Sequence, residues 1–233
     1  MQLALYKKFL HPIHPQGWPF VAVFAVAAFF LAKWNVHLGW VGALLTLWCA
    51  FFFRDPKRQV PQDQNLAVSP ADGLVEMIAM AAPPREMELG DTLRPRISIF
   101  MSVFDVHINR APMNCTVAKQ IYKPGKFLSA ELDKASDENE RNSLLCSLPD
   151  GNNLVVVQIA GLVARRIKSF VKEGDVLAAG SRIGLIRFGS RVDVYLPEGA
   201  APLVCVGQKA IAGETVLADL GAAKTAPRQA LAI

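Results

Sequence analysis

The sequence has few of the side chains that build metal centres or disulfide frameworks. Its four cysteines lie far apart, with no C-x-x-C pair and no histidine nearby at ligand spacing. Isolated cysteines of this kind are typical of reduced, buried thiols in a protein that faces the cytoplasm. A glycine-rich phosphate-binding loop is missing as well. The sequence therefore predicts neither a metal site nor a disulfide.

Histidine and net charge are also unevenly supplied. Three of the four histidines lie in or beside an amino-terminal apolar segment, so His107 is the only imidazole in the rest of the chain. Residues 1 to 58 have a net charge of +5, whereas the remaining residues have 19 basic and 19 acidic side chains. A balanced body without a basic stripe argues against nucleic-acid binding.

Two long apolar runs dominate the amino-terminal end. Residues 19–32 are apolar without interruption, the segment KWNVH breaks the run, and residues 38–53 resume it. This pattern predicts a helical hairpin that anchors the protein in a membrane. Each arm would be about 21 to 24 Å long, against a hydrocarbon core of roughly 30 Å. Two arrangements remain open: a pair of tight spans with tryptophans at the interfaces, or a re-entrant hairpin in one leaflet.

Basic residues flank this hairpin on both outer sides, with Lys7 and Lys8 before it and Arg54, Lys57 and Arg58 after it. The positive-inside rule then predicts that both ends, and the body that follows, lie on the cytoplasmic face of the cell membrane. A cleaved signal peptide fits less well, because no small-residue cleavage site follows the first arm. A buried core hairpin is disfavoured by the length of the apolar segment.

From about Pro61 onward, short alternating or β-branched runs are separated by Gly, Pro and Asp. This pattern predicts a mainly β (α+β) fold, with an anchor in residues 1–58 and a β-rich domain in residues 59–233. The segments VKEGDVLAAGSRIGLI and VGQKAIAGETVLADL share a loose pattern that is typical of the flattened barrel-sandwich of lipoyl and biotinyl carriers. A carrier would present a lysine at its hairpin tip, whereas Gly189 and Ser190 occupy the strand junction here.

The Gly189-Ser190 dipeptide lies within LIRFGSRVDVYLP, which otherwise alternates like two short strands. Gly-Ser is a common turn dipeptide and needs no chemistry. It is also a bond that a protein can cut by itself, because the serine hydroxyl can attack the preceding carbonyl and glycine leaves that carbonyl open. The dipeptide alone leaves both interpretations open.

Three motifs and their order bear on the choice between a plain turn and a self-cleavage site. SPADG occupies residues 69–73, FDVHINRAP residues 104–112 and RFGSRVDVYLP residues 187–197, with FFRDPKR at 52–58 closing the apolar segment and NER at 139–141. With these motifs the chain resembles the phosphatidylserine decarboxylase family, in its short, membrane-anchored prokaryotic form. The resemblance covers essentially the whole chain.

The resemblance implies a pyruvoyl-dependent enzyme that converts phosphatidylserine to phosphatidylethanolamine. Ser190 would attack the Gly189 carbonyl, and the resulting ester would eliminate to leave a covalent pyruvoyl group on residue 190. That group would accept the substrate amine as a Schiff base and take up the electrons that decarboxylation releases. The two pieces, residues 1–189 and 190–233, are expected to stay associated through a shared core.

The resemblance also implies roles for individual side chains. His107 is the expected proton donor, and Asp72 and Asp105 match a relay that activates Ser190 for self-cleavage. Longer bacterial relatives have a second histidine where this chain has Arg110, so either His107 serves both cleavage and protonation, or carboxylates and strain promote cleavage while Arg110 stabilises an oxyanion. We favour the first option, because arginine does not act as a base. Without a catalytic role, His107 would be an ordinary core histidine, and Asp72 would belong to an ordinary Asp-Gly turn.

The anionic substrate calls for cationic partners, and the candidates are Arg110, Arg141, Arg187 and Arg191. For each of them a solvated strand face is the alternative. The expected partners are a membrane phospholipid and an anionic membrane surface, with no nucleic acid, and a homodimer is one assembly that the sequence allows. Two other functions remain open: a pyruvoyl decarboxylase of another amino-headgroup lipid, and a non-catalytic, membrane-tethered barrel-sandwich adaptor.

Overall fold

A computed structural model describes residues 11–125, 139–161, 166–187 and 190–221. Its internal contacts divide the chain into two units, Met1–Lys57 and Arg58–Ile233. Arg58 belongs to the second unit because its side chain pairs with an acid there, one residue away from the boundary expected from the sequence. Each unit is described by itself.

The first unit is a helical hairpin, formed by a short 3-10 turn η1 (Pro15–Gly17), helix α2 (Trp18–Trp34) and helix α3 (Val36–Phe52). Asn35 separates the helices, and its side chain accepts a hydrogen bond of 2.8 Å from the backbone of His37, which caps α3. Gly39 and Gly42 let the helices approach closely, since a Cβ at either position would overlap Ala32 or Ala28. The predicted hairpin is confirmed.

Both helices are apolar on all sides. The continuous helical segment Pro15–Trp34 has 20 residues and a mean hydropathy of 1.6, and it is long enough to cross a membrane, whereas Val36–Phe52 is shorter. The first arm is longer than its apolar run because the flanking tryptophans and the 3-10 turn continue the helix. Apolar surface on every side is typical of a helix in lipid, and it indicates membrane association.

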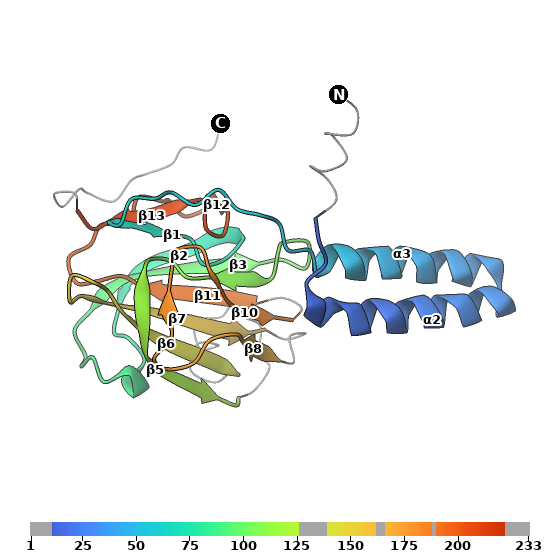
Figure 1. Ribbon diagram of the computed structural model, residues 1–233, viewed down its shortest axis with the longest axis horizontal. Coiled ribbons are helices and arrows are strands. Elements are labelled where there is room, and N and C mark those ends of the chain that lie inside the picture. The colour runs from blue at the N-terminus through green and yellow to red at the C-terminus, as the bar shows by residue number, and fades with distance from the viewer. Residues whose placement is uncertain (1–10, 126–138, 162–165, 188–189, 222–233) are drawn as a thin grey trace, which may run out of the picture. The chain divides into compact units, whose positions relative to one another are not determined.

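The second unit is built around an eight-stranded sheet in which every pairing is antiparallel (Figure 1). In spatial order its strands are β12 (Lys209–Ala210), β2 (Gly73–Ala81), β3 (Arg94–Met101), β11 (Ser190–Tyr195), β7 (Asn153–Ala160), β6 (Arg141–Ser147), β5 (Cys115–Lys123) and β9 (Val176–Leu177). The sheet curls into a half-barrel, and a 3-10 turn η2 (Arg85–Met87) connects β2 to β3. The predicted mainly β class is confirmed.

Two smaller sheets complete the unit. The first has the order β4 (Ile108–Arg110), β10 (Arg182–Ile186) and β8 (Ile167–Ser169), and the second pairs β1 (Leu66–Val68) with β13 (Val216–Asp219). Apolar side chains of all three sheets meet in one core, which includes Ile99, Val192, Ile183 and Leu217. Burial of this apolar surface is what stabilises the arrangement.

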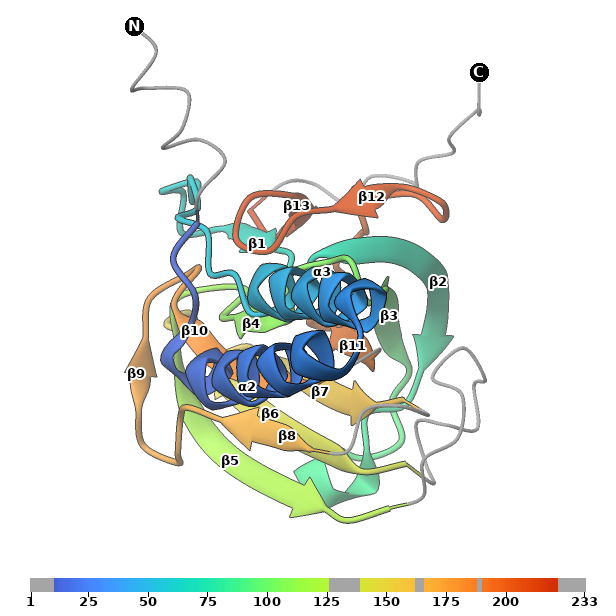
Figure 2. The same ribbon diagram turned by 90° about the vertical axis from the view of Figure 1, so that its right-hand side faces the viewer.

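Strand β11 is central to the large sheet, between β3 and β7 (Figure 2). Its alternation sends Val192 and Val194 into the main core, while Tyr195 belongs to a smaller apolar cluster on the opposite face. Because β11 pairs over its whole length on both sides, a break before Ser190 would leave this strand held by the rest of the sheet.

The junction at Gly189-Ser190 is not a hairpin turn between paired strands. β10 pairs with β4 and β8, whereas β11 pairs with β3 and β7. The chain therefore passes from one sheet to another at this point, and Ser190 is already a strand residue. Gly189 lies outside the described residues.

Candidate active site

Ser190 is the first residue of β11 and is fully buried. It pairs with Met101 at the end of β3 and with Ala160 at the end of β7. Its hydroxyl Oγ has no hydrogen-bond partner in the part of the chain that the structure describes. Leaving a buried hydroxyl unsatisfied costs about 1–3 kcal/mol, so such a group calls for an explanation, and a reactive role is one.

His107 lies in the turn that follows Met101, the strand partner of Ser190. The Asp105 carboxylate closes this turn by accepting hydrogen bonds from the backbone N–H and the hydroxyl of Ser102, at 2.9 and 2.7 Å. The Nδ1 atom of His107 is 3.0 Å from the backbone carbonyl oxygen of Asp105. A carbonyl only accepts, so Nδ1 carries the proton, and in the neutral ring Nε2 has the lone pair.

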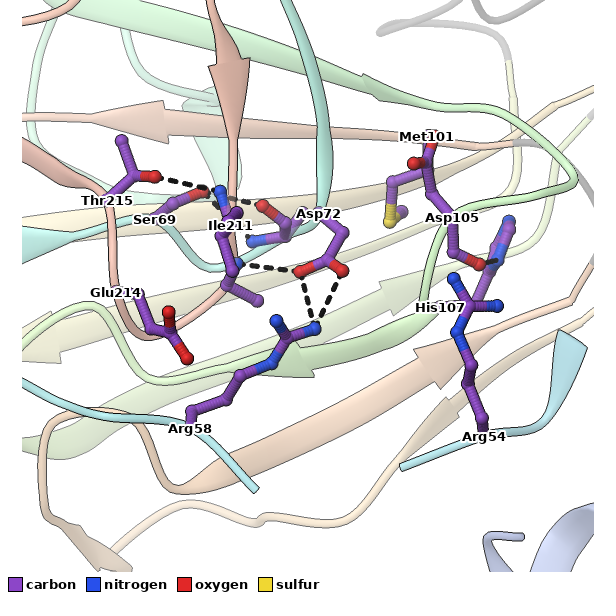
Figure 3. A network of polar contacts seen from close by, with 12 residues as sticks. Arg54, Arg58, Ser69, Asp72, Met101, Asp105, His107, Ile211, Glu214 and Thr215 are labelled. Atoms are coloured by element: carbon purple, nitrogen blue, oxygen red, sulfur yellow. Dashed lines mark hydrogen bonds and ion pairs between the residues drawn. The ribbon is translucent and has the colours of Figure 1, made fainter. Parts of the chain in front are cut away.

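Two backbone connections bring this turn to the same end of the sheet as Ser190. Met101 leads directly into the turn, and the N–H of Ile186, at the end of β10, donates to the carbonyl of His107 at 3.3 Å. Figure 3 shows Met101, Asp105 and His107 in one group. The imidazole is fully buried, so the structure combines a buried hydroxyl and a buried histidine with a defined tautomer.

Asp72 lies in the turn between β1 and β2, and its carboxylate accepts three hydrogen bonds from two residues. One nitrogen of Arg58 contacts both carboxylate oxygens, at 2.7 and 2.8 Å, and the N–H of Ala212 donates to one of them at 2.8 Å (Figure 3). Gly73 follows with φ of 153°, and a Cβ there would overlap the carbonyl oxygen of Phe100. The Asp-Gly pair is therefore required by close backbone approach as well as by the carboxylate.

Arg110 belongs to the group around Asp72. Its guanidinium donates to the carbonyl of Gly180 at 2.9 Å, and its backbone N–H donates to Pro70. A Cβ on Gly213 would be 3.4 Å from the Arg110 side chain and 3.5 Å from that of Arg58. The side chains of Arg58 and Arg110 thus both border Gly213, and the Arg58 guanidinium reaches the Asp72 carboxylate. Sequence reasoning did not select Arg58, because 14 residues separate it from Asp72.

Arg187 ends the described part of the chain before the candidate cleavage point. Its N–H donates to the carbonyl of Arg166 at 3.4 Å. Burial, and then the charge of Arg166, lower the pKa of Arg187 below its ordinary value. Two cations in partial burial favour an anion between them. Arg166 was not among the residues selected from the sequence, because the pairing of β8 with β10 that brings it beside Arg187 is visible only in the fold.

Arg141 and Arg191 lie on the other face of the sheet from the Ser190 side chain. The Arg191 guanidinium binds the Asp193 carboxylate at 2.8 and 2.9 Å, and each side chain is 1% exposed. Arg141 binds Glu86 at 2.9 Å. A polar cavity of about 500 Å³ borders Arg141 and Asp193. The structure does not bring these two arginines to Ser190, and their predicted role in substrate binding stays a prediction.

Metal ligands are not grouped within the described ranges, where no three His, Cys, Asp or Glu side chains come together.

Comparison with known proteins identifies the family. The family profile described as phosphatidylserine decarboxylase matches residues 45–218. A phosphatidylserine decarboxylase proenzyme of Paramagnetospirillum magneticum is 60% identical over 219 residues, covering 94% of this chain and 91% of the relative. The proenzyme of Beijerinckia indica is 55% identical over 225 residues, covering 97% of each chain. The chain belongs to the phosphatidylserine decarboxylase family.

The matched range contains SPADG, FDVHINRAP and RFGSRVDVYLP, so the resemblance read from these motifs is confirmed. Both phosphatidylserine decarboxylase relatives are named proenzymes, which fits a precursor that undergoes processing. The roles of individual residues in this phosphatidylserine decarboxylase chain stay predictions, and the geometry above is the basis on which they are proposed.

Proposed function

We propose that this chain is a proenzyme that cuts its own backbone between Gly189 and Ser190 and then decarboxylates phosphatidylserine to phosphatidylethanolamine. The observation that carries the proposal is the buried Oγ of Ser190, at the start of a central strand, which has no hydrogen-bond partner among the residues that the structure describes. Family membership supports the reaction, and the proenzyme relatives support the processing.

The residues around position 190 fit a pyruvoyl group made from Ser190. Burial excludes water from the site, and the pairing of β11 with β3 and β7 would keep a new chain end in place. Such a group supplies an electron sink for the carbon–carbon bond that breaks in decarboxylation. The rest of the chemistry falls to the chain's own side chains.

His107 is the proposed base for maturation and the proposed acid for turnover. Because its Nδ1 proton is directed to the Asp105 carbonyl, Nε2 is the atom that exchanges a proton. Imidazole suits both directions near neutral pH. Asp105 acts by closing the turn that holds His107. Arg110 does not take over the role of the second histidine as a base, since its guanidinium stays protonated.

Asp72 is proposed to position the site. Its two oxygens already accept hydrogen bonds from Arg58 and Ala212, so the carboxylate is better suited to fixing neighbouring cations than to removing a proton. Its ion pair with Arg58 and the hydrogen bond from the Arg110 backbone N–H to Pro70 hold the SPADG turn. This arrangement favours His107 as the group that activates Ser190.

Arg187, together with Arg166, is proposed to bind the phosphodiester or the carboxylate of the substrate. An anion between these guanidinium groups would relieve their mutual repulsion and gain charge-assisted hydrogen bonds. Arg110 is a further candidate. The ion pairs of Arg141 and Arg191 favour a structural role for both.

The apolar hairpin is proposed to hold the enzyme at the cytoplasmic face of the membrane. Each buried methylene of the acyl chains contributes roughly 0.8 kcal/mol to membrane partition, so a diacyl lipid stays in the bilayer and the enzyme must come to it. The basic residues on both sides of the hairpin support this orientation and an anionic membrane surface.

Electrophoresis and intact-mass measurement of the purified protein test the proposal. The wild type is expected as two chains, with residues 190–233 lighter by one ammonia than their sequence, whereas Ser190→Ala stays whole and inactive. Release of carbon dioxide is expected from phosphatidylserine vesicles and not from free serine. An active wild type of full length with an intact serine would refute the proposal.

A further inference from the structure

A chain of side-chain amides crosses the core face of the large sheet, from the half-buried Gln120 to the fully buried Asn109, and its last donor lies at the same end of the sheet as Ser190. Gln120 donates to Asn142 at 3.1 Å, Asn142 to Gln158 at 2.8 Å, and Gln158 to Asn109 at 2.7 Å. Asn109 in turn directs its amide nitrogen Nδ2 to the sulfur of Met101 at 3.5 Å. Every amide donates in the same direction, so the dipoles add and the donor end is at Asn109.

The last donor of the amide chain, Nδ2 of Asn109, has only a weak acceptor. Asn109 is fully buried, and a thioether is a weak acceptor for an amide N–H. Met101 pairs directly with Ser190, and both side chains face the main core. The polarised amide of Asn109 therefore contacts the methionine that pairs with Ser190, whose hydroxyl has no partner in the described ranges.

Glycine at position 184 keeps the amide chain intact. A Cβ on Gly184 would lie 2.7 Å from the amide nitrogen of Gln158, the side chain that holds Asn109. The room for this chain is thus built into β10, the strand that precedes the candidate cleavage point. Asn109 itself is two residues after His107, on the strand paired with β10.

We propose that Asn109 donates a hydrogen bond from Nδ2 to Oγ of Ser190 during self-cleavage, an inference that rests on the proposed function. Met101 and Ser190 are directly paired, and the Cβ atoms of such a pair are about 4.5–5.5 Å apart. The methionine side chain is flexible enough to move aside and let the Asn109 amide reach Oγ. Asn109 would then leave the weak sulfur contact for an oxygen that develops charge. A donor placed at such an oxygen stabilises its charged form.

Each of the two steps of cleavage has a stage at which that oxygen is negatively charged. In the attack, the charge is on Oγ when its proton leaves, and it passes to the Gly189 carbonyl oxygen as the new bond forms. In the elimination, the charge returns to Oγ as it departs. In the first, Oγ gives its proton to the base and bonds to the Gly189 carbonyl carbon, the carbon–nitrogen bond breaks, and the Ser190 nitrogen takes the proton. In the second, a base removes the Ser190 α-proton, a Cα–Cβ double bond forms, the Cβ–Oγ bond breaks, and Oγ departs as part of the Gly189 carboxylate. The dehydroalanine left at residue 190 then takes up a water and releases ammonia to give the pyruvoyl group. One donor to Oγ thus assists attack and elimination.

The test follows the rate at which newly synthesised full-length chains are cut, measured by electrophoresis and intact mass. Asn109→Leu is expected to slow cleavage about 10²-fold, the usual effect of removing such a donor. In a Ser190→Cys background the loss should be much smaller, because a thiol ionises with a pKa near 8.5 and needs less help. An equal loss in both backgrounds would assign Asn109 a purely structural role and overturn the inference.

Two further variants decide the matter if Asn109→Leu fails to fold. Gln158→Met removes the amide that aims Asn109 and is expected to slow cleavage, whereas Met101→Leu releases the donor and is expected to leave the rate unchanged or higher. Equal slowing by both would overturn the inference. Ser98→Ala is the matched control, since it removes from β3 a different buried hydroxyl that also has no partner in the part of the chain that the structure describes. A wild type that is never cut would refute the proposed function itself, whereas normal cutting of Asn109→Leu refutes only this inference.

Discussion

Arg191 follows the candidate cleavage point directly, and its replacement separates a structural role from a role in substrate binding. The Arg191–Asp193 pair is 1% exposed on both sides, so Arg191→Met leaves a carboxylate buried without its main counter-charge. Breaking a buried pair by removing one partner costs about 3–5 kcal/mol. This is a large part of the roughly 5–15 kcal/mol that stabilises a whole domain.

The double variant Arg191→Met/Asp193→Leu removes both charges and fills the space with apolar atoms. Replacing a buried pair in this way is often neutral or stabilising, so the double variant should unfold within about 1 kcal/mol of the parent. The large cost of the single variant and the small cost of the double variant are the expected signature of a structural pair.

The assay needs an uncut chain, because two associated pieces do not unfold as a two-state system. A Ser190→Ala background supplies it, and pulse proteolysis in urea measures the free energy of unfolding. Tryptophan fluorescence would not serve, since all four tryptophans lie in the first unit. If Arg191→Met were as stable as the parent in the Ser190→Ala background but raised KM for phosphatidylserine in the chain that retains Ser190, the structural assignment would be refuted and the substrate-binding prediction upheld.

Three further predictions follow from the site. His107→Ala should remain whole on a gel, because it lacks the proposed base; a cut but inactive product would confine His107 to turnover. Arg187→Gln and Arg166→Gln should each raise KM about 10- to 100-fold through a lost charge-assisted hydrogen bond, with cleavage unchanged. Arg182→Gln, at the opposite end of β10 from Arg187, is the control; an unchanged KM would count against the anion site. Burial opposes ionisation of Glu86, but hydrogen bonds from its own backbone and Lys123, and the charge of Arg141, bring its pKa below the ordinary 4.5. The stability that Glu86 contributes is therefore present above pH 4.5 and lost as the pH falls through the lower folded value, so the difference in unfolding free energy between the Ser190→Ala parent and Glu86→Gln should shrink with acid; a constant difference would contradict this.

The sequence was sufficient for features that depend on local pattern. Uninterrupted apolar runs around KWNVH predicted the helical hairpin, and period-two alternation predicted the β-rich body. The three motifs predicted the family without any structural information. Position 190 was singled out by a motif, and the structure adds that its hydroxyl is buried and without a partner in the described residues.

Features that depend on which strands meet could not be predicted. β10 and β11 look like the arms of one hairpin in the sequence, yet they join different sheets because their partners come from distant segments. The pairing of Arg58 with Asp72 likewise depends on the fold of the SPADG turn. The ion pair of Arg191, by contrast, could have been predicted from the sequence. Residues two apart on a strand lie on the same face of the sheet, which makes Asp193 the expected partner of Arg191.

The central place of β11 has a consequence for quality control during biosynthesis. Ser190 is brought beside Met101 and the His107 turn only after three distant segments of the chain have paired. In a chain that matures as proposed, a misfolded copy keeps its serine and remains inert, whereas a native copy activates itself. A cut chain would thus be one that has reached the native fold, and the ratio of cut to uncut chains in a cell extract would measure the folding yield directly.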